Sequence, residues 1–337
     1  MLIRPVALSD HADVLALAKI AGFGMTSLPA DEDVLQAKIA RSVASFANDP
    51  KHKGNEAFLF VMEDPATGSV VGTTGIKAHV GRNQPFYSYK VSTITQQSRD
   101  LNLFSKHKML HVTNDLTDSS EIGSLFLKPD YRRDRLGRVL SLCRFLFMAP
   151  HLDYFGDQVI AEMRGVHDRR GNSPFYDSIA RHFFEMEFYK ADYINATQGN
   201  QFINDLMPKY PIYVSLLPER AQDVIGEPNQ ASAPAYAMLE KEGFRWQGYI
   251  DIFDGGPTLQ VAPEQIRSLR ESKCAEIKAI DDSLDTGRHI VTTDGFADFR
   301  ACDSRLAVND DGRVTISSRA QKALQVSPGD MVRYLAL

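Results

Sequence analysis

Cysteine and long apolar runs are both scarce in this sequence. The three cysteines, Cys143, Cys274 and Cys302, are far apart and lack the close spacing of a structural zinc site or a disulfide scaffold. No stretch of about 18 consecutive apolar residues occurs, and the first residues lack the basic and apolar regions of an export signal. These absences argue against a metal site, a membrane partner and export. We therefore expect a cytoplasmic protein in a reducing compartment.

Excess positive charge is also missing. Lys and Arg total 38 against 43 Asp and Glu, which gives a formal net charge of −5 with histidine neutral. A protein that coats nucleic acid usually carries a basic excess, so the composition makes nucleic acid an unfavourable partner. What is present is ordinary for a globular protein: 43% hydrophobic and 24% charged residues, in a chain long enough for about two folding units.

The order of the expected elements indicates a mixed α/β (α+β) protein. Apolar periodicity predicts a helix over 173–188, further helices that begin near 9, 31, 136 and 234, and strands at 2–5, 57–63, 69–79, 122–127, 158–164 and 249–253. We expect an inserted broad hairpin at 82–118, part helix and part linker at 259–284, and a strand-rich tail from 289. These elements suggest one elaborated domain at residues 1–280 and a small β-rich module at residues 281–337.

A basic turn stands between the strand at 122–127 and the helix that follows it. The turn and the first helical residues are Arg132, Arg133, Arg135, Leu136, Gly137 and Arg138. Free amides at a helix N-terminus, with the helix dipole behind them, bind anions, and arginines add bidentate contacts to phosphate. The turn therefore favours a diphosphate-binding site, with a solvated basic turn before a buried helix as the alternative.

A second segment, residues 235–244, ends a helix at Gly243 and enters a strand, which is also what an ordinary glycine C-cap does. Together with the basic turn and the strand-helix-helix-strand-strand opening, it resembles the GNAT-type acyl-CoA N-acyltransferase superfamily. Further blocks resemble the arginine N-succinyltransferase family: residues 26–29 (TSLP), 121–131, 144–149 (RFLFMA), 161–165 (AEMRG), 173–175 (SPF), 206–213 (LMPKYPIY) and 249–259 (YIDIFDGGPTL).

The resemblance implies a fold, an activity and a co-substrate. In the GNAT-type fold two neighbouring strands, here 122–127 and 158–164, part to admit the pantetheine arm of coenzyme A. The implied activity transfers a succinyl group from succinyl-CoA to the α-amino group of arginine, with ornithine as a second acceptor. Succinyl-CoA is then a co-substrate and not a permanently bound cofactor. Leu125 falls at the family's succinyl-CoA contact, with Leu127 beside it on the strand, and ordinary strand core is the alternative for Leu125.

Two positions of this sequence differ from the motifs of the superfamily and the family that it resembles. The superfamily's turn usually has a glycine where this sequence has Arg135, whose side chain either narrows the approach of the phosphates or adds a charge contact. The family places a proton-donating histidine after a Val-Ile-Gly motif, and here that position holds Asn229. An amide cannot relay a proton at neutral pH, so Asn229 orients substrate, or marks a protein whose chemistry has weakened.

Glu162, Tyr176 and His182 are the remaining candidates for proton transfer. Glu162 lies within an apolar strand, where a carboxylate needs a ligand or a partner, and a structural ion pair with an arginine is the alternative. Tyr176 and His182 lie on the helix expected over 173–188, where a phenol can protonate a thiolate. Phe175, Ile179 and Phe183 have the spacing of that helix's buried stripe, which leaves Tyr176 on a neighbouring face.

A guanidinium substrate calls for carboxylates, and a succinyl tail calls for Arg or Lys. The sequence offers Glu121, Glu162, Asp251 and Asp254 for the first role, Arg164 and Lys209 for the second, and Ser173 as a further substrate contact. Asp254 is equally well explained as a turn residue before two glycines.

Two other functions compete with succinyl transfer to a basic amino acid. One is an acyl-CoA-dependent N-acyltransferase with a different amine acceptor. The other is a catalytically silent acyl-CoA-binding subunit, suggested by Asn229 and by a tail over 313–333 that looks like the small hairpin modules of some DNA-binding regulators. We also expect self-association, as a homo-oligomer or with a paralogous subunit.

Overall fold

The computed structural model describes residues 1–22, 25–48, 54–168 and 171–337. The chain forms two compact units. Unit 1 comprises Met1–Ala78, Ile122–Asp157 and Ala262–Leu337, and unit 2 comprises His79–Glu121 and Gln158–Val261. Among the described residues we find no helix with both the length and the apolar character that a membrane span requires.

Unit 1 is built on strands that pair in the order β12-β15-β11-β14-β13-β1-β2-β3-β6. Its strands are β1 (Leu2–Pro5), β2 (Ala57–Glu63), β3 (Val70–Lys77), β6 (Ser120–Leu127, beginning in unit 2), β11 (Lys273–Ile280), β12 (Arg288–Thr292), β13 (Ala301–Val308), β14 (Val314–Ile316) and β15 (Met331–Ala336). Its α-helices are α1 (His11–Ala21), α2 (Glu32–Phe46), α3 (Leu136–Met148), α10 (Arg267–Glu271) and α11 (Ser318–Leu324).

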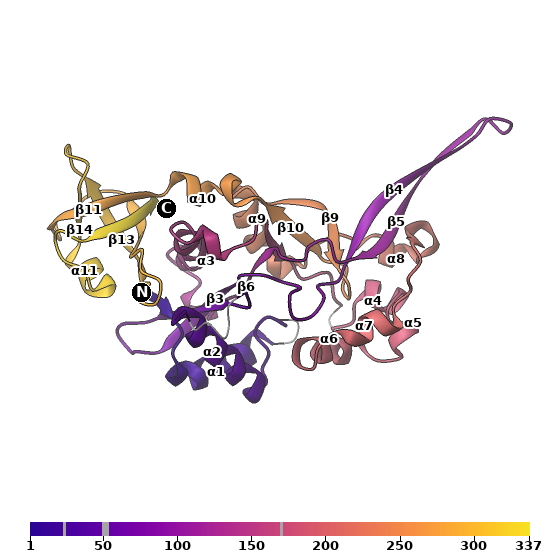
Figure 1. The fold of residues 1–337 in the computed structure, drawn as a ribbon, viewed down its shortest axis with the longest axis horizontal. Coiled ribbons are helices and arrows are strands. Elements are labelled where there is room, and N and C mark those ends of the chain that lie inside the picture. The colour runs from indigo at the N-terminus through magenta and orange to yellow at the C-terminus, as the bar shows by residue number, and fades with distance from the viewer. Residues whose placement is uncertain (23–24, 49–53, 169–170) are drawn as a thin grey trace. The chain divides into compact units, whose positions relative to one another are not determined.

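Helices α1 and α2 lie side by side in unit 1, drawn in indigo in Figure 1. Asp31 begins α2, because its side chain accepts a hydrogen bond from the Val34 N–H as an N-cap. Leu17 and Leu35 are fully buried in one cluster with residues of β2, so the periodic apolar faces expected for these helices do form part of the core. In the C-terminal part, α11 packs on β13, and β11 pairs with both β14 and β15.

Unit 2 contains strands that pair in the order β7-β10-β9-β4-β5-β8. They are β4 (Ser88–Ser98), β5 (Leu103–Thr113), β7 (Val159–Glu162), β8 (Ile212–Tyr213), β9 (Arg245–Asp251) and β10 (Pro257–Val261), and the α-helices are α4 (Pro174–Ser178), α5 (Arg181–Phe184), α6 (Phe188–Thr197), α7 (Gln201–Leu206), α8 (Glu219–Gln222) and α9 (Ala233–Lys241). The insertion expected at 82–118 is confirmed as the long β4–β5 hairpin, which extends away from the helices of this unit (Figure 1).

Two expectations about secondary structure are wrong. Residues 259–284 are not mainly helix and linker, since they include most of β10 and all of β11. The helix expected over 173–188 is broken into α4, α5 and the start of α6, because the backbone leaves helical geometry at Ile179 and turns left-handed at Glu185. The breaks let Ile179 and Phe184 enter the same apolar cluster, so tertiary packing overrides the local helical pattern here.

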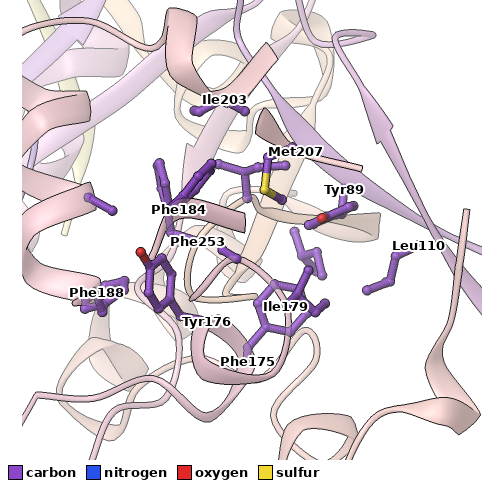
Figure 2. Close-up of a cluster of buried hydrophobic side chains, with 14 of the residues drawn as sticks. Tyr89, Leu110, Phe175, Tyr176, Ile179, Phe184, Phe188, Ile203, Met207 and Phe253 are labelled. Atoms are coloured by element: carbon purple, nitrogen blue, oxygen red, sulfur yellow. The ribbon is translucent and has the colours of Figure 1, made fainter. Parts of the chain in front are cut away.

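Tyr176 lies inside this cluster, and the expected buried stripe is therefore wrong as well. Tyr176 is fully buried, whereas Phe183 is 41% exposed. Figure 2 shows the Tyr176 ring beside Phe188 and Phe253, with which its ring centroid makes distances of 5.4 and 6.4 Å. The Tyr176 hydroxyl donates to the Met186 carbonyl at 3.1 Å, and burial raises the pKa of the phenol. These contacts are those of a core tyrosine with a satisfied hydroxyl.

Candidate functional site

Strand β6 carries a kink immediately before Leu125. Ser124 adopts φ +53°, which is a left-handed conformation that a non-glycine residue rarely takes within a strand. The Ser124 N–H donates to Ser27 Oγ at 3.0 Å, its hydroxyl donates to the Ser27 carbonyl at 2.7 Å, and Lys38 Nζ donates to Ser124 Oγ at 3.0 Å. The 26–29 block of the sequence thus holds the kink in place, and half-buried Leu125 follows it.

The N-terminus of α3 leaves an open space for an anion. Arg135 is the N-cap residue and adopts φ +61°, while a Cβ added at Gly137 would meet nothing within 4 Å. Arg138 and Val139 both direct their N–H groups to the Arg135 carbonyl. Within the described ranges, the Gly137 N–H has no hydrogen-bond acceptor. An unpaired amide at the start of a 13-residue helix is a donor suited to a phosphate oxygen.

The basic side chains around this helix start differ in how they are held. Arg132 Nε donates to the Leu127 carbonyl at 3.0 Å, and its guanidinium lies 5.6 Å from the Phe126 ring centroid. Arg135 donates to the Leu337 carbonyl at 3.2 Å. Arg133 is well exposed, Arg138 is half-buried, and both Leu127 and Leu136 are buried core residues. Arg133 and Arg138 thus place two further positive charges at this helix start.

Within unit 2, the parallel pairing of β6 with β7 covers two registered positions, Ser120 with Val159 and Glu121 with Ile160. Strand β7 continues beyond that pairing along β10, where Glu162 is registered with Thr258. Glu121 is 7% exposed, and Glu162 is half-buried.

A cluster of carboxylates lies at the end of β7. Asp254 Oδ2 accepts from the Gly165 N–H at 2.8 Å, and its Oδ1 accepts from the Gly256 N–H at the same distance. Asp251 Oδ1 accepts from the Phe253 and Asp254 N–H groups at 2.8 and 2.7 Å. Burial, together with the neighbouring carboxylates, raises the pKa of both aspartates. Asp254 is thus both a turn residue and a member of this cluster.

Asp192 of α6 completes the carboxylate cluster. Burial, and then the charge of Asp251, raises the pKa of Asp192 to about 7, while the Arg164 guanidinium opposes that rise. The Arg164 charge also acts to lower the pKa of Asp254. Arg164, expected to hold a succinyl carboxylate, therefore lies close enough to these aspartates to act as their counter-ion. Three acidic groups around one arginine leave a site that favours a further cation.

His167 and Asn229 meet at the same strand end. The Asn229 N–H donates to the Arg164 carbonyl at 2.7 Å, and Pro228 forms a β-bridge with Gly165. The Asn229 side chain accepts from the Ala231 N–H at 2.9 Å, which makes it an N-cap. The His167 side chain is 5% exposed, its Nδ1 lies 2.8 Å from the Gly165 carbonyl, and its Nε2 lies 3.7 Å from Asp254 Oδ2.

The other predicted site residues lie apart from this cluster or within the core. His182 is exposed on α5, and Lys209 is exposed after α7. Ser173 is fully buried and accepts from the Tyr176 N–H at 3.3 Å as the N-cap of α4. In the described part of the chain, no group of three or more His, Cys, Asp or Glu side chains is arranged to hold a metal ion.

Two residues of the cluster were missed by the sequence reasoning. Asp192 lies in a region without strong periodicity, and the sequence gives no signal that it meets Asp251. His167 had a weak signal, since it follows the 161–165 block by two residues and is the histidine nearest to that strand in the sequence. The structure unites these residues because Gly165 lies against the 254–256 turn, where a Cβ on Gly256 would fall 2.1 Å from the Met163 carbonyl oxygen.

Comparison with known proteins gives full-length matches. The family described as arginine N-succinyltransferase beta subunit matches residues 1–268, and that subunit's C-terminal domain matches residues 273–336. An arginine N-succinyltransferase of Yersinia pseudotuberculosis serotype IB (strain PB1/+) is 42% identical over 346 residues, covering 100% of this chain and 98% of that protein. Its counterpart in Escherichia coli (strain 55989 / EAEC) is 42% identical over 338 residues with the same coverage.

A solved structure is similar over nearly the whole chain. Arginine/ornithine succinyltransferase subunit AI from Pseudomonas aeruginosa superposes with a TM-score of 0.91 at 36% identity, covering 99% of this chain and 98% of that one. The mixed α/β fold with a β-rich C-terminal part is thereby confirmed, as is the resemblance to the arginine N-succinyltransferase family drawn from the sequence blocks. The chain belongs to the arginine N-succinyltransferase family of acyltransferases.

Proposed function

We propose that the chain transfers the succinyl group of succinyl-CoA to the α-amino group of arginine, with ornithine as a second acceptor. Family membership supports the reaction class. The observation that carries the choice of acceptor is the cluster of Asp192, Asp251 and Asp254 with raised pKa values. A cation entering this cluster relieves the repulsion among the carboxylates, so a basic amino acid gains more binding free energy there than a neutral one.

The proposed donor site is the start of α3. The Gly137 N–H lies at the positive end of the helix dipole, and a Cβ at this residue would meet nothing within 4 Å; this suits the diphosphate of coenzyme A, to which Arg133 and Arg138 add charge. The kink at Ser124 sets the direction of β6 at Leu125, where an amide of the strand can face the thioester carbonyl. The proposed transfer is a direct attack of the amine on the thioester carbonyl, without a covalent enzyme intermediate.

Arginine must lose a proton from its α-ammonium group before it can attack. That group has a pKa of about 8, so a modest base suffices. Glu162 remains the prediction for this step. Tyr176 and His182 remain predictions for protonation of the thiolate, with Tyr176 the less suited because its hydroxyl already donates to Met186. In this proposal Asn229 moves no proton, because its side chain caps the turn that follows it.

The proposal also covers the cellular compartment, the self-association and the domain boundary of the protein. All three cysteines are free thiols, which suits the reducing cytoplasm. Self-association, with a second copy or with a paralogous subunit, stays a prediction that light scattering of the purified chain measures. The domain boundary near residue 280 likewise stays a prediction, which limited proteolysis tests.

Release of free thiol from succinyl-CoA by the purified chain tests the function. We expect turnover with arginine, weaker turnover with ornithine, and none with Nα-acetylarginine, whose α-amine is blocked. Acetyl-CoA serves as the matched donor control, since it keeps the diphosphate and the thioester but lacks the distal carboxylate. If succinyl-CoA binds but no basic amino acid promotes thiol release, the proposed activity is wrong. Equal turnover with a neutral amine would instead favour a different acceptor.

A further inference from the structure

His167 is a buried histidine whose second ring nitrogen has no hydrogen-bond partner. Its side chain is 5% exposed and packs against the Phe188 ring at a centroid distance of 4.8 Å. Because a carbonyl oxygen only accepts, the 2.8 Å contact with Gly165 fixes the proton on Nδ1. Arg164 Nε also points to Nδ1, at 3.4 Å; this longer contact needs Nδ1 as an acceptor, so it competes with the shorter contact to Gly165. The lone pair of the neutral ring is left on Nε2, which no described residue hydrogen-bonds.

The unpaired Nε2 faces a second acceptor. Asp254 Oδ2 lies 3.7 Å away, too far for a hydrogen bond between the two, and in the ionised state both atoms offer only lone pairs. Two buried acceptors at this spacing fit one donor nitrogen placed about 2.8 Å from each. A primary ammonium group, such as the α-ammonium of arginine, can supply two such N–H bonds.

The charged groups that face His167 come from each element packed around it. Arg164 and Asp168 belong to its own segment, and Asp254 belongs to the β9–β10 turn. From α6, the Phe188 ring packs against the imidazole. Burial, followed by the Arg164 charge, lowers the pKa of His167 to about 4. The ring is therefore neutral at neutral pH, and one of its nitrogens carries a lone pair.

The position of His167 also matches the group that the sequence lacks. The backbone of Asn229, which stands where the family has its histidine, is bonded to Arg164, and His167 folds back on the adjacent Gly165. Both side chains therefore start from the same strand end. We propose that His167 Nε2 accepts the proton of the substrate amine and then donates it to the thiolate, and so takes over the proton-donating role that the family assigns to the residue at position 229. This inference rests on the proposed succinyl transfer to arginine.

The proposed step balances in protons and electrons. The α-ammonium N–H bond breaks, its electron pair stays on nitrogen, and Nε2 binds the proton with its own lone pair. The freed amine pair forms the C–N bond at the thioester carbonyl, and the C–S bond then breaks with its electrons on sulfur. The imidazolium, stabilised by the Asp254 carboxylate, gives its proton to the thiolate. The second proton lost by the nitrogen goes to solvent, and the amide keeps the third.

Steady-state kinetics of the purified full chain test His167. We expect His167→Asn to lower kcat about 10²-fold or more with a smaller change in KM for arginine, and to remove the acid limb of the kcat/KM profile. His107→Asn on the β4–β5 hairpin is the matched control and should leave both unchanged. Adding Asn229→His to the His167→Asn background should restore at least tenfold in kcat, since an imidazole again starts from this strand end.

The possible outcomes distinguish a failure of the proposed His167 role from a failure of the proposed succinyl transfer. Absence of wild-type turnover overturns the proposed function itself. Wild-type turnover with kcat of His167→Asn within threefold, and an unchanged pH profile, overturns the role of His167 alone. Because His167→Asn could fail to fold, the single variant Asn229→His provides an independent check. A gain of less than threefold supports a proton path already carried by His167, and a tenfold gain overturns it.

Discussion

Replacing Asp192 by asparagine should stabilise the empty protein and weaken arginine binding. Burial and the Asp251 charge raise the pKa of Asp192 from an ordinary 3.8 to about 7. A carboxyl group whose pKa is higher in the folded than in the unfolded chain makes the folded state bind more protons. Stability therefore falls as the pH rises from about 4 to about 7, and the loss is complete above that window. Asparagine keeps the shape of the side chain but never carries this charge.

The size of the effect follows from the shift. Three pKa units at 1.36 kcal/mol each give an upper limit of about 4 kcal/mol, which solvent penetration around a half-buried group reduces to roughly 1–3 kcal/mol. At roughly 2 °C per kcal/mol for a chain of this size, Asp192→Asn should raise Tm by about 2–6 °C at pH 8. Conversely, saturating arginine should raise the Tm of the wild-type protein far more than that of the variant.

Thermal unfolding between pH 5 and pH 8 measures both parts of this prediction. The difference in Tm between Asp192→Asn and wild type should widen as the pH rises to about 7 and then stay constant. Asp223→Asn, at an exposed residue after α8, is the matched control and should show no such trend. A difference that does not change with pH, or a variant less stable than wild type at pH 8, would refute the reasoning.

Three further substitutions test separate parts of the structure. Gly256→Ala places a Cβ 2.1 Å from the Met163 carbonyl oxygen, so we expect urea unfolding to show a free energy of unfolding lower by about 2 kcal/mol or more. The control is Gly287→Ala, whose Cβ would meet nothing within 4 Å and should change this free energy little. Arg144 is 2% exposed and hydrogen-bonds only Ser141 among the described residues, so its charge is buried without a carboxylate partner in these contacts. Arg144→Met should therefore leave the free energy of unfolding unchanged or raise it. A loss above about 3 kcal/mol would contradict this view. Arg135→Gly replaces an arginine in the left-handed conformation and should raise the free energy of unfolding by about 1 kcal/mol. The loss of the positive charge should also raise KM for succinyl-CoA. A lower Tm would show that the backbone there is unstrained.

The helices and strands could be predicted where the apolar pattern is regular and local. Asp31 caps its helix as expected, and the 57–63 and 69–79 strands form the β2–β3 pair. The prediction failed where packing between distant segments decides the structure. Periodicity alone cannot distinguish one helix over 173–188 from two short helices whose side chains fill a core with Tyr89 and Phe253. Likewise, the charged residues of 273–280 did not predict a strand, and β11 is stabilised there by pairing with β14 and β15.

The candidate site divides in the same way between local and distant contributions. The anion site needs only one helix start, and the sequence predicts it around Gly137. The carboxylate cluster needs α6, the end of β7 and the β9–β10 turn together, so no spacing rule could pair Asp192 with Asp251. Asp254 shows why a structural role does not exclude a chemical one: the two backbone N–H groups that bind its oxygens also fix its carboxylate beside His167.

Asn229 shows what a motif comparison loses when it treats each position alone. The missing histidine suggests a silent subunit, because an amide cannot transfer a proton. In three dimensions position 229 is one of several points from which a side chain can start at this strand end, and His167 starts at another. The proposed transfer uses a basic nitrogen near the aspartates, and His167 offers one beside Asp254 although position 229 does not. The buried lone pair on Nε2 of His167 therefore argues for retained catalysis more strongly than Asn229 argues against it.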